Sequence, residues 1–242
     1  MPIHFDLTLT LGMLIVGVGA LLQSSTGFGF ALFAAPLLAL LDPHLVPGPI
    51  LILTLFLTIG VLVRDWRHID WPGLGWISAG RLPATLVAAL TATMVPKTQL
   101  SVVFAIFVLC GVAVSLTGKR FRPNPTALVT AGGLAGFFGT LTSIGAPPLV
   151  LVYQHQPAPV IRSTLSANVV IGTIASIVAL TVGGQIGVTE LTRSAAFAPA
   201  CIAGLMLSRY ARPLLDGGYI RPILLLVSAG AAVGVLVREV LR

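Results

Sequence analysis

Two polar stretches in an otherwise apolar chain contain the residue types that could bind a small anion. Each is rich in glycine, serine and threonine and precedes a proline, which predicts a break in a membrane helix. A half-helix that starts after such a break exposes backbone N–H groups and a partial positive charge. Alternatively, the small residues only allow close helix packing. The candidate ligands are Gln23, Ser24, Ser25, Thr26, Gly27 and Gly29 in the first stretch, and Thr140, Thr142, Ser143, Gly145 and Pro147 in the second.

Arg81 is the charged residue that lies well inside a predicted span. A buried arginine is costly in lipid, so it is usually paired or functional. We therefore take Arg81 as a candidate charge partner for the substrate, although it could also extend to the membrane interface. Asn168 lies on the polar face of an apolar segment and is either a further ligand or the partner in an interhelical hydrogen bond.

The acidic residues favour an anion over a cation as the ligand. All of them fall in predicted loops or at the ends of predicted spans, whereas a cation pump or a carboxylate proton relay normally needs one at a span centre. The sequence contains no phosphate-binding loop motif, and its four histidines have no metal-ligand spacing. We therefore expect no metal, no cofactor and no enzymatic activity.

The composition places these residues in a membrane protein. Of 242 residues, 56% are hydrophobic and only 9% are charged, with a formal net charge of +7. An ordinary soluble domain has about 25% charged residues. The apolar content excludes a soluble globule, a disordered chain and a nucleic-acid-binding protein. The excess of positive charge is typical of cytoplasmic loops.

We predict an all-α, polytopic integral membrane protein with eight full spans and two short segments. The short segments, 28–41 and 144–153, are broken by glycine and proline and indicate half-helices. The eight spans are predicted at residues 8–26, 46–63, 73–95, 100–117, 126–143, 163–182, 194–208 and 219–237.

The order of these segments repeats, which predicts two homologous halves. Residues 1–118 form the first half, residues 119–125 a basic linker and residues 126–242 the second half. If the short segments cross the membrane fully, the halves are inverted; if they are re-entrant, the halves are parallel. With inverted halves, a slightly larger share of the lysines and arginines lies on one side of the membrane than with parallel halves. The positive-inside bias therefore favours the inverted arrangement.

The first polar stretch, from Gly17 through residues 25–29 to residues 36–38, resembles the first signature block of the sulfite exporter TauE/SafE family. The basic loop at residues 64–71 and the repeated half are also similar to that family. The resemblance extends from about residue 10 to residue 238. It implies a permease of the bacterial cytoplasmic membrane that moves sulfite or related inorganic or organic sulfur anions. By position, it carries the substrate ligands to Ser24, Ser25, Thr26, Gly27, Thr142, Ser143 and Gly145.

We therefore predict a secondary transporter that binds its anion between the two broken segments and works by alternating access. Its partners are a small sulfur anion and the lipid bilayer, with no nucleic acid. A passive anion channel and a transporter of another small anion are the alternatives. Two other classes are less favoured. An intramembrane enzyme would need a nucleophile with its base or a set of metal ligands, which the sequence does not offer. A purely structural subunit would need no binding site and would tolerate mutation of the two polar stretches.

Overall fold

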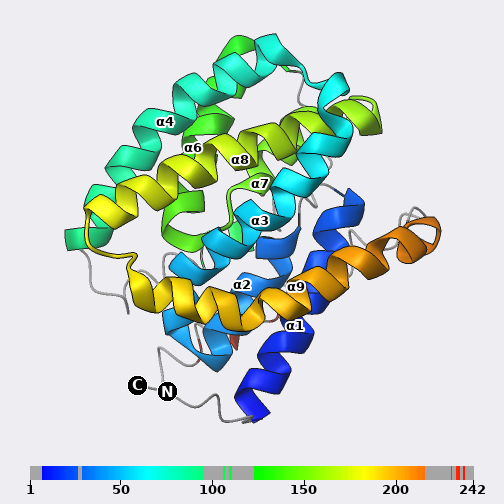
Figure 1. The fold of residues 1–242 in the computed structure, drawn as a ribbon. Coiled ribbons are helices and arrows are strands. Elements are labelled where there is room, and N and C mark those ends of the chain that lie inside the picture. Colours follow the sequence, from blue (N-terminus) through cyan, green and yellow to red (C-terminus); the bar gives the residue numbers. More distant parts are fainter. Residues whose placement is uncertain are drawn as a thin grey trace.

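The computed structural model describes residues 7–26, 29–94, 106, 109–110, 123–215, 230, 233–234 and 237. In this part of the chain every regular element is helical (Figure 1). The helices are α1 (Leu7–Thr26), α2 (Phe30–Leu41), α3 (Gly48–Asp65), α4 (Trp71–Met94), α6 (Pro125–Thr142), α7 (Ala146–Tyr153), α8 (Ala158–Val182) and α9 (Val188–Leu215), with short 3-10 turns at Pro43–Leu45 and Trp66–His68.

The predicted segments correspond closely to these helices. The two short runs form separate helices, α2 with 12 residues and α7 with 8. Six of the predicted spans overlap α1, α3, α4, α6, α8 and α9, although α8 and α9 begin earlier than predicted and α9 also ends later. The predicted spans at 100–117 and 219–237 lie largely outside the described residues. The glycines before α2 and α7 therefore located the breaks, and Pro147 and Pro148 lie in the first turn of α7 as expected, whereas Pro36 lies inside α2 and does not end it.

Local chemistry explains where α6 begins and ends. Its first turn is capped by the Asn124 side chain, which accepts a 2.8 Å hydrogen bond from the Ala127 N–H group, and Pro125 occupies the first helical position. Its end is Ser143, whose backbone is left-handed with φ 65°. A left-handed residue of this kind terminates a helix, so the chain leaves α6 at the point where the sequence predicts a break.

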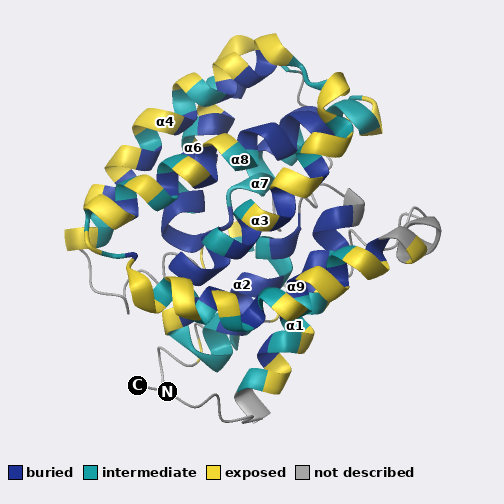
Figure 2. Cartoon of the chain, viewed as in Figure 1, coloured by how far each residue is buried: buried dark blue, intermediate teal, exposed yellow. Residues whose placement is uncertain are grey.

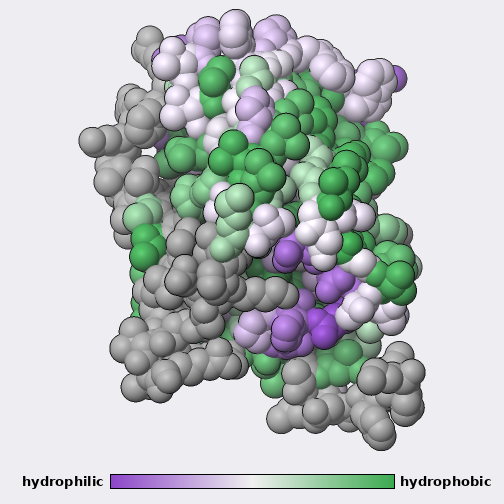
Figure 3. Space-filling view, turned by 90° about the vertical axis from the view of Figure 1, so that its left-hand side faces the viewer, coloured by the Kyte–Doolittle hydropathy of each residue, from purple (hydrophilic) through white to green (hydrophobic). Residues whose placement is uncertain are grey.

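Four described helical stretches are long and apolar enough to cross a membrane: Gly48–His68, Trp71–Met94, Ala158–Val182 and Val188–Ser208. Large apolar side chains point outward along them, including Leu86 and Leu90 of α4 and Val178 and Val182 of α8. Figure 2 shows exposed residues along the outer faces of α4 and α8, and Figure 3 shows apolar residues over much of one side. Exposed apolar faces of this extent are typical of lipid contact, and they support the membrane assignment.

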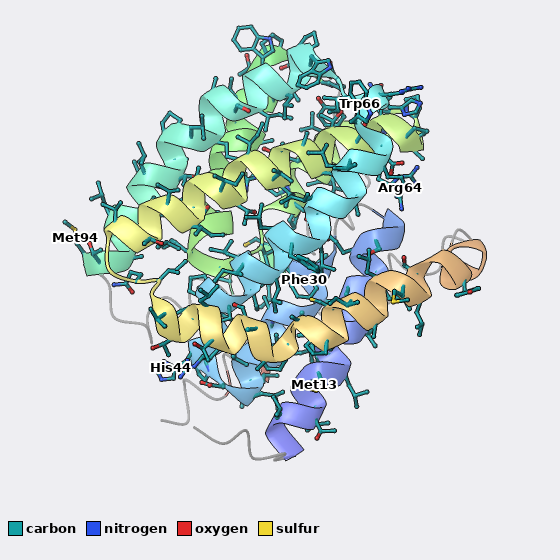
Figure 4. The ribbon with its side chains drawn as sticks, viewed as in Figure 1. Met13, Phe30, His44, Arg64, Trp66 and Met94 are labelled. Atoms are coloured by element: carbon teal, nitrogen blue, oxygen red, sulfur yellow. The ribbon has the colours of Figure 1, made fainter. Side chains whose placement is uncertain are left out.

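The molecule has two distinct ends. At one end, Arg193 of α9 donates a 3.2 Å hydrogen bond to the carbonyl oxygen of His44, just before α3 begins. At the other end, where α3 finishes, Asp65 forms ion pairs with Arg64 and Arg162. Figure 4 labels His44 and Arg64 toward these opposite ends. We refer to them as the His44 end and the Asp65 end.

The ends of three further helices, α4, α7 and α8, also lie at the Asp65 end. The N–H group of Asp70, just before α4, donates to Thr164 Oγ1 of α8 at 3.0 Å. The hydroxyl of Tyr153, at the end of α7, donates to Asp70 Oδ2 at 2.8 Å. The start of α4, the end of α7 and the start of α8 therefore lie together.

Two pairs of helices cross at close range and run in the same direction. Along α1 and α9, Gly12 faces the Phe197 ring, and Gly17 lies farther along against Gly204. Along α4 and α6, the carbonyl of Ile77 faces Gly132 and that of Arg81 faces Gly136. Because α9 begins at the His44 end and α4 at the Asp65 end, α1 and α6 start at opposite ends of the molecule.

Candidate functional site

A small cavity lies between the two broken segments. Gly29, the residue before α2, and Gly145, the residue before α7, both line it. Its walls also include Arg81 of α4 and Thr173 of α8. The cavity offers about 30 Å³ to water, which is room for about two or three molecules. A compact anion of a few heavy atoms suits a space of this size.

The first break is held by the Gln23 side chain. Its Nε2 atom donates a 2.8 Å hydrogen bond to Thr58 Oγ1 of α3, and its Oε1 atom accepts a 3.1 Å hydrogen bond from the Phe30 N–H group. Gly29 has φ 119°, a conformation that strains residues with a side chain. Gln23 therefore satisfies the first N–H group of α2, one of the helix-end donors that the sequence predicts for the substrate.

The second break is also largely satisfied within the protein. The Ser143 hydroxyl donates a 3.0 Å hydrogen bond to the Pro47 carbonyl, and the Ile144 N–H group donates to Thr142 Oγ1 at 3.1 Å. Pro147 and Pro148 in the first turn of α7 have no N–H group. This break therefore offers fewer free N–H donors than the sequence predicts, because one N–H group is satisfied by a side chain and two residues of the first turn are prolines.

Arg81 contributes a buried positive charge to the cavity. The residue is only 4% exposed, and its Nε and Nη1 atoms are buried with no hydrogen-bond partner among the described residues. Its guanidinium lies directly on Gly172 of α8, where a Cβ atom would overlap it. The ion pairs found in this part of the chain are those of Asp65 and do not involve Arg81. A buried charge without a partner is strongly unfavourable, which makes this guanidinium a candidate group for binding an anion.

Three further buried residues of the described structure, on α3, α4 and α8, have side-chain polar atoms without hydrogen-bond partners. Thr85 lies one turn farther along α4, and Asn168 lies one turn before Gly172 along α8; both are fully buried. Their side-chain polar atoms make no hydrogen bond in the described structure, and neither does Thr54 Oγ1, whose residue lines the cavity. The interhelical hydrogen bond considered for Asn168 is thus not formed among these residues.

Five of the predicted ligands line the cavity and five do not. Gln23, Gly29, Arg81, Ser143 and Gly145 are in its walls. Among the others, Ser24 Oγ donates to the Ala20 carbonyl at 2.8 Å. Thr140 Oγ1 donates to the Gly136 carbonyl at 2.7 Å and shares another 2.7 Å hydrogen bond with Ser176 Oγ. The predicted ligands outside the walls are Ser24, Thr140, Thr142, Pro147 and Asn168.

The remaining predictions at the first break lie outside the described part of the chain. The side chains of Ser25 and Thr26 and the whole of Gly27 are in this group.

Sequence reasoning overlooked three residues of the site. Thr54 and Thr173 line the cavity, and Gly172 supports the Arg81 guanidinium. Thr54 precedes Thr58 by one helical turn in an otherwise apolar segment, and this i, i+4 polar pair was the available signal. Gly172 carries no such signal, because an isolated glycine in an apolar span is common.

The chain matches the model of one protein family, described as sulfite exporter TauE/SafE, over residues 11–235. No curated protein and no solved structure matches it. The family match covers nearly the whole chain, including both broken segments and the cavity between them. The chain therefore belongs to the sulfite exporter TauE/SafE family.

Proposed function

We propose that the protein is a secondary transporter that binds sulfite or a related small sulfur oxyanion in the Arg81 cavity. Membership of the sulfite exporter TauE/SafE family implies a membrane transporter of sulfur anions and not an enzyme. The observation that carries the assignment of the site is the buried guanidinium of Arg81, which has no counterion in the described structure. An anion in the cavity would supply that missing charge.

The proposed ligands divide into a charged donor and polar wall groups. Arg81 would donate to the oxyanion, and the unpartnered hydroxyl of Thr54 would add a neutral hydrogen bond. Gln23 and Ser143 would have a positioning role, because their hydrogen bonds to Thr58 and Pro47 hold the two breaks against α3 and the segment before it. This division replaces direct coordination by every Ser and Thr of the two stretches.

We also propose that residues 1–118 and 126–242 form inverted halves joined by the linker 119–125, with ten crossings in total. The opposite directions of α1 and α6, the first helices of the two halves, support inversion. The short helices α2 and α7 support it too, since α2 leads to the His44 end and α7 to the Asp65 end. The anion would then bind at the interface of the halves, as alternating access requires.

The distribution of arginines supports an orientation in the bacterial cytoplasmic membrane. Arg64, Arg67 and Arg162 lie at the Asp65 end, whereas Arg193 lies at the His44 end. Exposed tryptophans, including Trp66 and the first residue of α4, accompany the arginines, as in an interfacial aromatic belt. By the positive-inside bias, we propose that the Asp65 end faces the cytoplasm.

Purified protein in liposomes tests the site through Arg81→Gln and Arg81→Lys. We expect Arg81→Gln to reduce sulfite transport by about 30-fold or more, because it removes the charge partner of the anion. The same change should raise the Tm of the substrate-free protein, since it removes an uncompensated buried charge. Arg81→Lys should retain part of the transport.

Arg64→Gln is the matched control, because Arg64 is partly exposed and lies at the Asp65 end, away from the cavity. Its transport should stay close to that of the parent. Unchanged sulfite transport in Arg81→Gln would overturn the assignment of the site. Parent flux that rises linearly with sulfite concentration, without saturation, would indicate a channel instead of a transporter.

A further inference from the structure

We propose that the cavity selects singly charged anions, so that hydrogen sulfite and sulfonates bind and doubly charged sulfite and sulfate are rejected. The inference rests on the proposed function and specifies the charge state of its substrate. The balance of charge from the side chains and the helix ends around the cavity carries it.

The side chains that line the cavity supply one full charge. Arg81 is the one charged or titratable side chain among the described residues in its walls; the others are apolar residues, glycines, hydroxyl residues and one amide. The ion pairs of Asp65 lie at the end of α3, and Asp65 does not line the cavity. A singly charged anion beside Arg81 therefore produces a neutral site.

The helix ends do not add a second charge. Each break brings together the carbonyl end of one helix and the N–H end of the next, and their partial charges have opposite signs. At the second break, Ser143 ends α6 and Gly145 precedes α7, and both line the cavity. At the first break, α1 ends at Thr26 and α2 begins at Phe30. The two contributions largely offset each other, so Arg81 determines the net charge.

The neutral polar groups also favour a monoanion. The Gln23 amide oxygen accepts from the Phe30 N–H group, and one of its two N–H groups donates to Thr58. The Ser143 hydroxyl already donates its proton to the Pro47 carbonyl, so toward the cavity its oxygen can only accept. The remaining donors besides Arg81 are few, and a second negative charge would stay unneutralised inside a buried site. Such a charge is strongly disfavoured in a low-dielectric interior.

Two probes of similar shape test the proposal on the unmodified protein. Methanesulfonate and sulfate are both tetrahedral at sulfur, but methanesulfonate carries one negative charge and sulfate two. When sulfite uptake into liposomes is measured, methanesulfonate should compete with sulfite at least about tenfold more strongly than sulfate does. A tenfold ratio requires only a modest difference in binding free energy. Equal or stronger competition by sulfate would overturn the proposal.

Sulfite provides a second measurement that involves no methyl group. Because hydrogen sulfite loses its proton near neutral pH, the apparent affinity for total sulfite should fall between pH 6 and pH 8. The affinity for methanesulfonate should stay constant, because its charge does not change in this range. A sulfite affinity that is constant or increases with pH contradicts the proposal.

The failure of this inference is distinguishable from that of the proposed function. If sulfite transport requires Arg81 but sulfate competes as well as methanesulfonate, the site stands and the charge selection is wrong. If no sulfur anion competes and Arg81→Gln behaves like the parent, the proposed function itself is wrong.

Discussion

The two close helix crossings use the same packing device but have different surroundings. In the α1–α9 crossing, Gly204 brings the helices together, and the neighbouring buried residues Val16, Phe197 and Cys201 are apolar or weakly polar. In the α4–α6 crossing, Gly136 does the same beside the buried charge of Arg81. Small residues that let backbones approach are a general means of joining membrane helices. If the proposed site is right, the α1–α9 crossing only stabilises the fold, whereas the α4–α6 crossing also positions the anion ligand Arg81.

The strongest test of this difference is Gly172→Ala, which changes the surface beneath Arg81. The new methyl group would occupy the space of the guanidinium, so Arg81 would have to move. Displacement of a binding group by about 1 Å can cost about 100-fold in rate, and we expect a loss of sulfite transport of that order. Liposome uptake measures it.

Gly60→Ala is the control for Gly172→Ala. A Cβ atom at Gly60 of α3 would meet nothing within 4 Å, so transport should be unchanged and the helix should be slightly more stable. If Gly172→Ala transports sulfite like the parent, Arg81 is not held in its productive position by α8.

Gly136→Ala tests the α4–α6 crossing itself. A methyl group there would collide with the Arg81 carbonyl oxygen, and separating the two helices should destabilise the protein by about 1–3 kcal/mol. Because Arg81 moves with its helix, sulfite affinity should also fall. Gly133→Ala is the control, since its Cβ atom would lie 3.8 Å from the Gly80 carbonyl. Thermal unfolding and sulfite binding measured on the same samples give both quantities.

Gly204→Ala makes the corresponding change in the α1–α9 crossing. Its methyl group would meet the Gly17 carbonyl oxygen, and we again expect a loss of about 1–3 kcal/mol in unfolding free energy. Here the sulfite affinity of the folded protein should be unchanged, because no charged group lies at this crossing among the described residues. Gly17→Ala, with its nearest contact at 3.6 Å, serves as the control. A parallel loss of affinity would show that the two crossings are not separable.

The sequence located the breaks and Arg81 but not the direction in which hydroxyl groups point. Glycine and proline limit the backbone directly, so the predicted short segments 28–41 and 144–153 match the helices at residues 30–41 and 146–153 within two residues. Ser24 and Thr140 instead donate to carbonyls four residues earlier, an option open to any helical Ser or Thr. Whether such a residue faces a cavity depends on how its helix is rotated against its neighbours, and spacing along the chain does not determine that rotation.

The smallest expected effect lies outside both crossings, at Asp65. Its carboxylate joins α3 to α8 through Arg162 at 2.6 Å and also contacts Arg64 at 2.7 Å. Because both arginines are about one-third exposed, with side-chain exposures of 34% and 30%, Asp65→Asn should cost only about 0.5–1 kcal/mol of stability. High salt should reduce the difference between variant and parent, since salt screens exposed charges. Sulfite affinity should not change, because Asp65 does not line the cavity. A reduced affinity in Asp65→Asn would instead mean that the pairing at this end controls the anion site through α8, on which Gly172 supports Arg81.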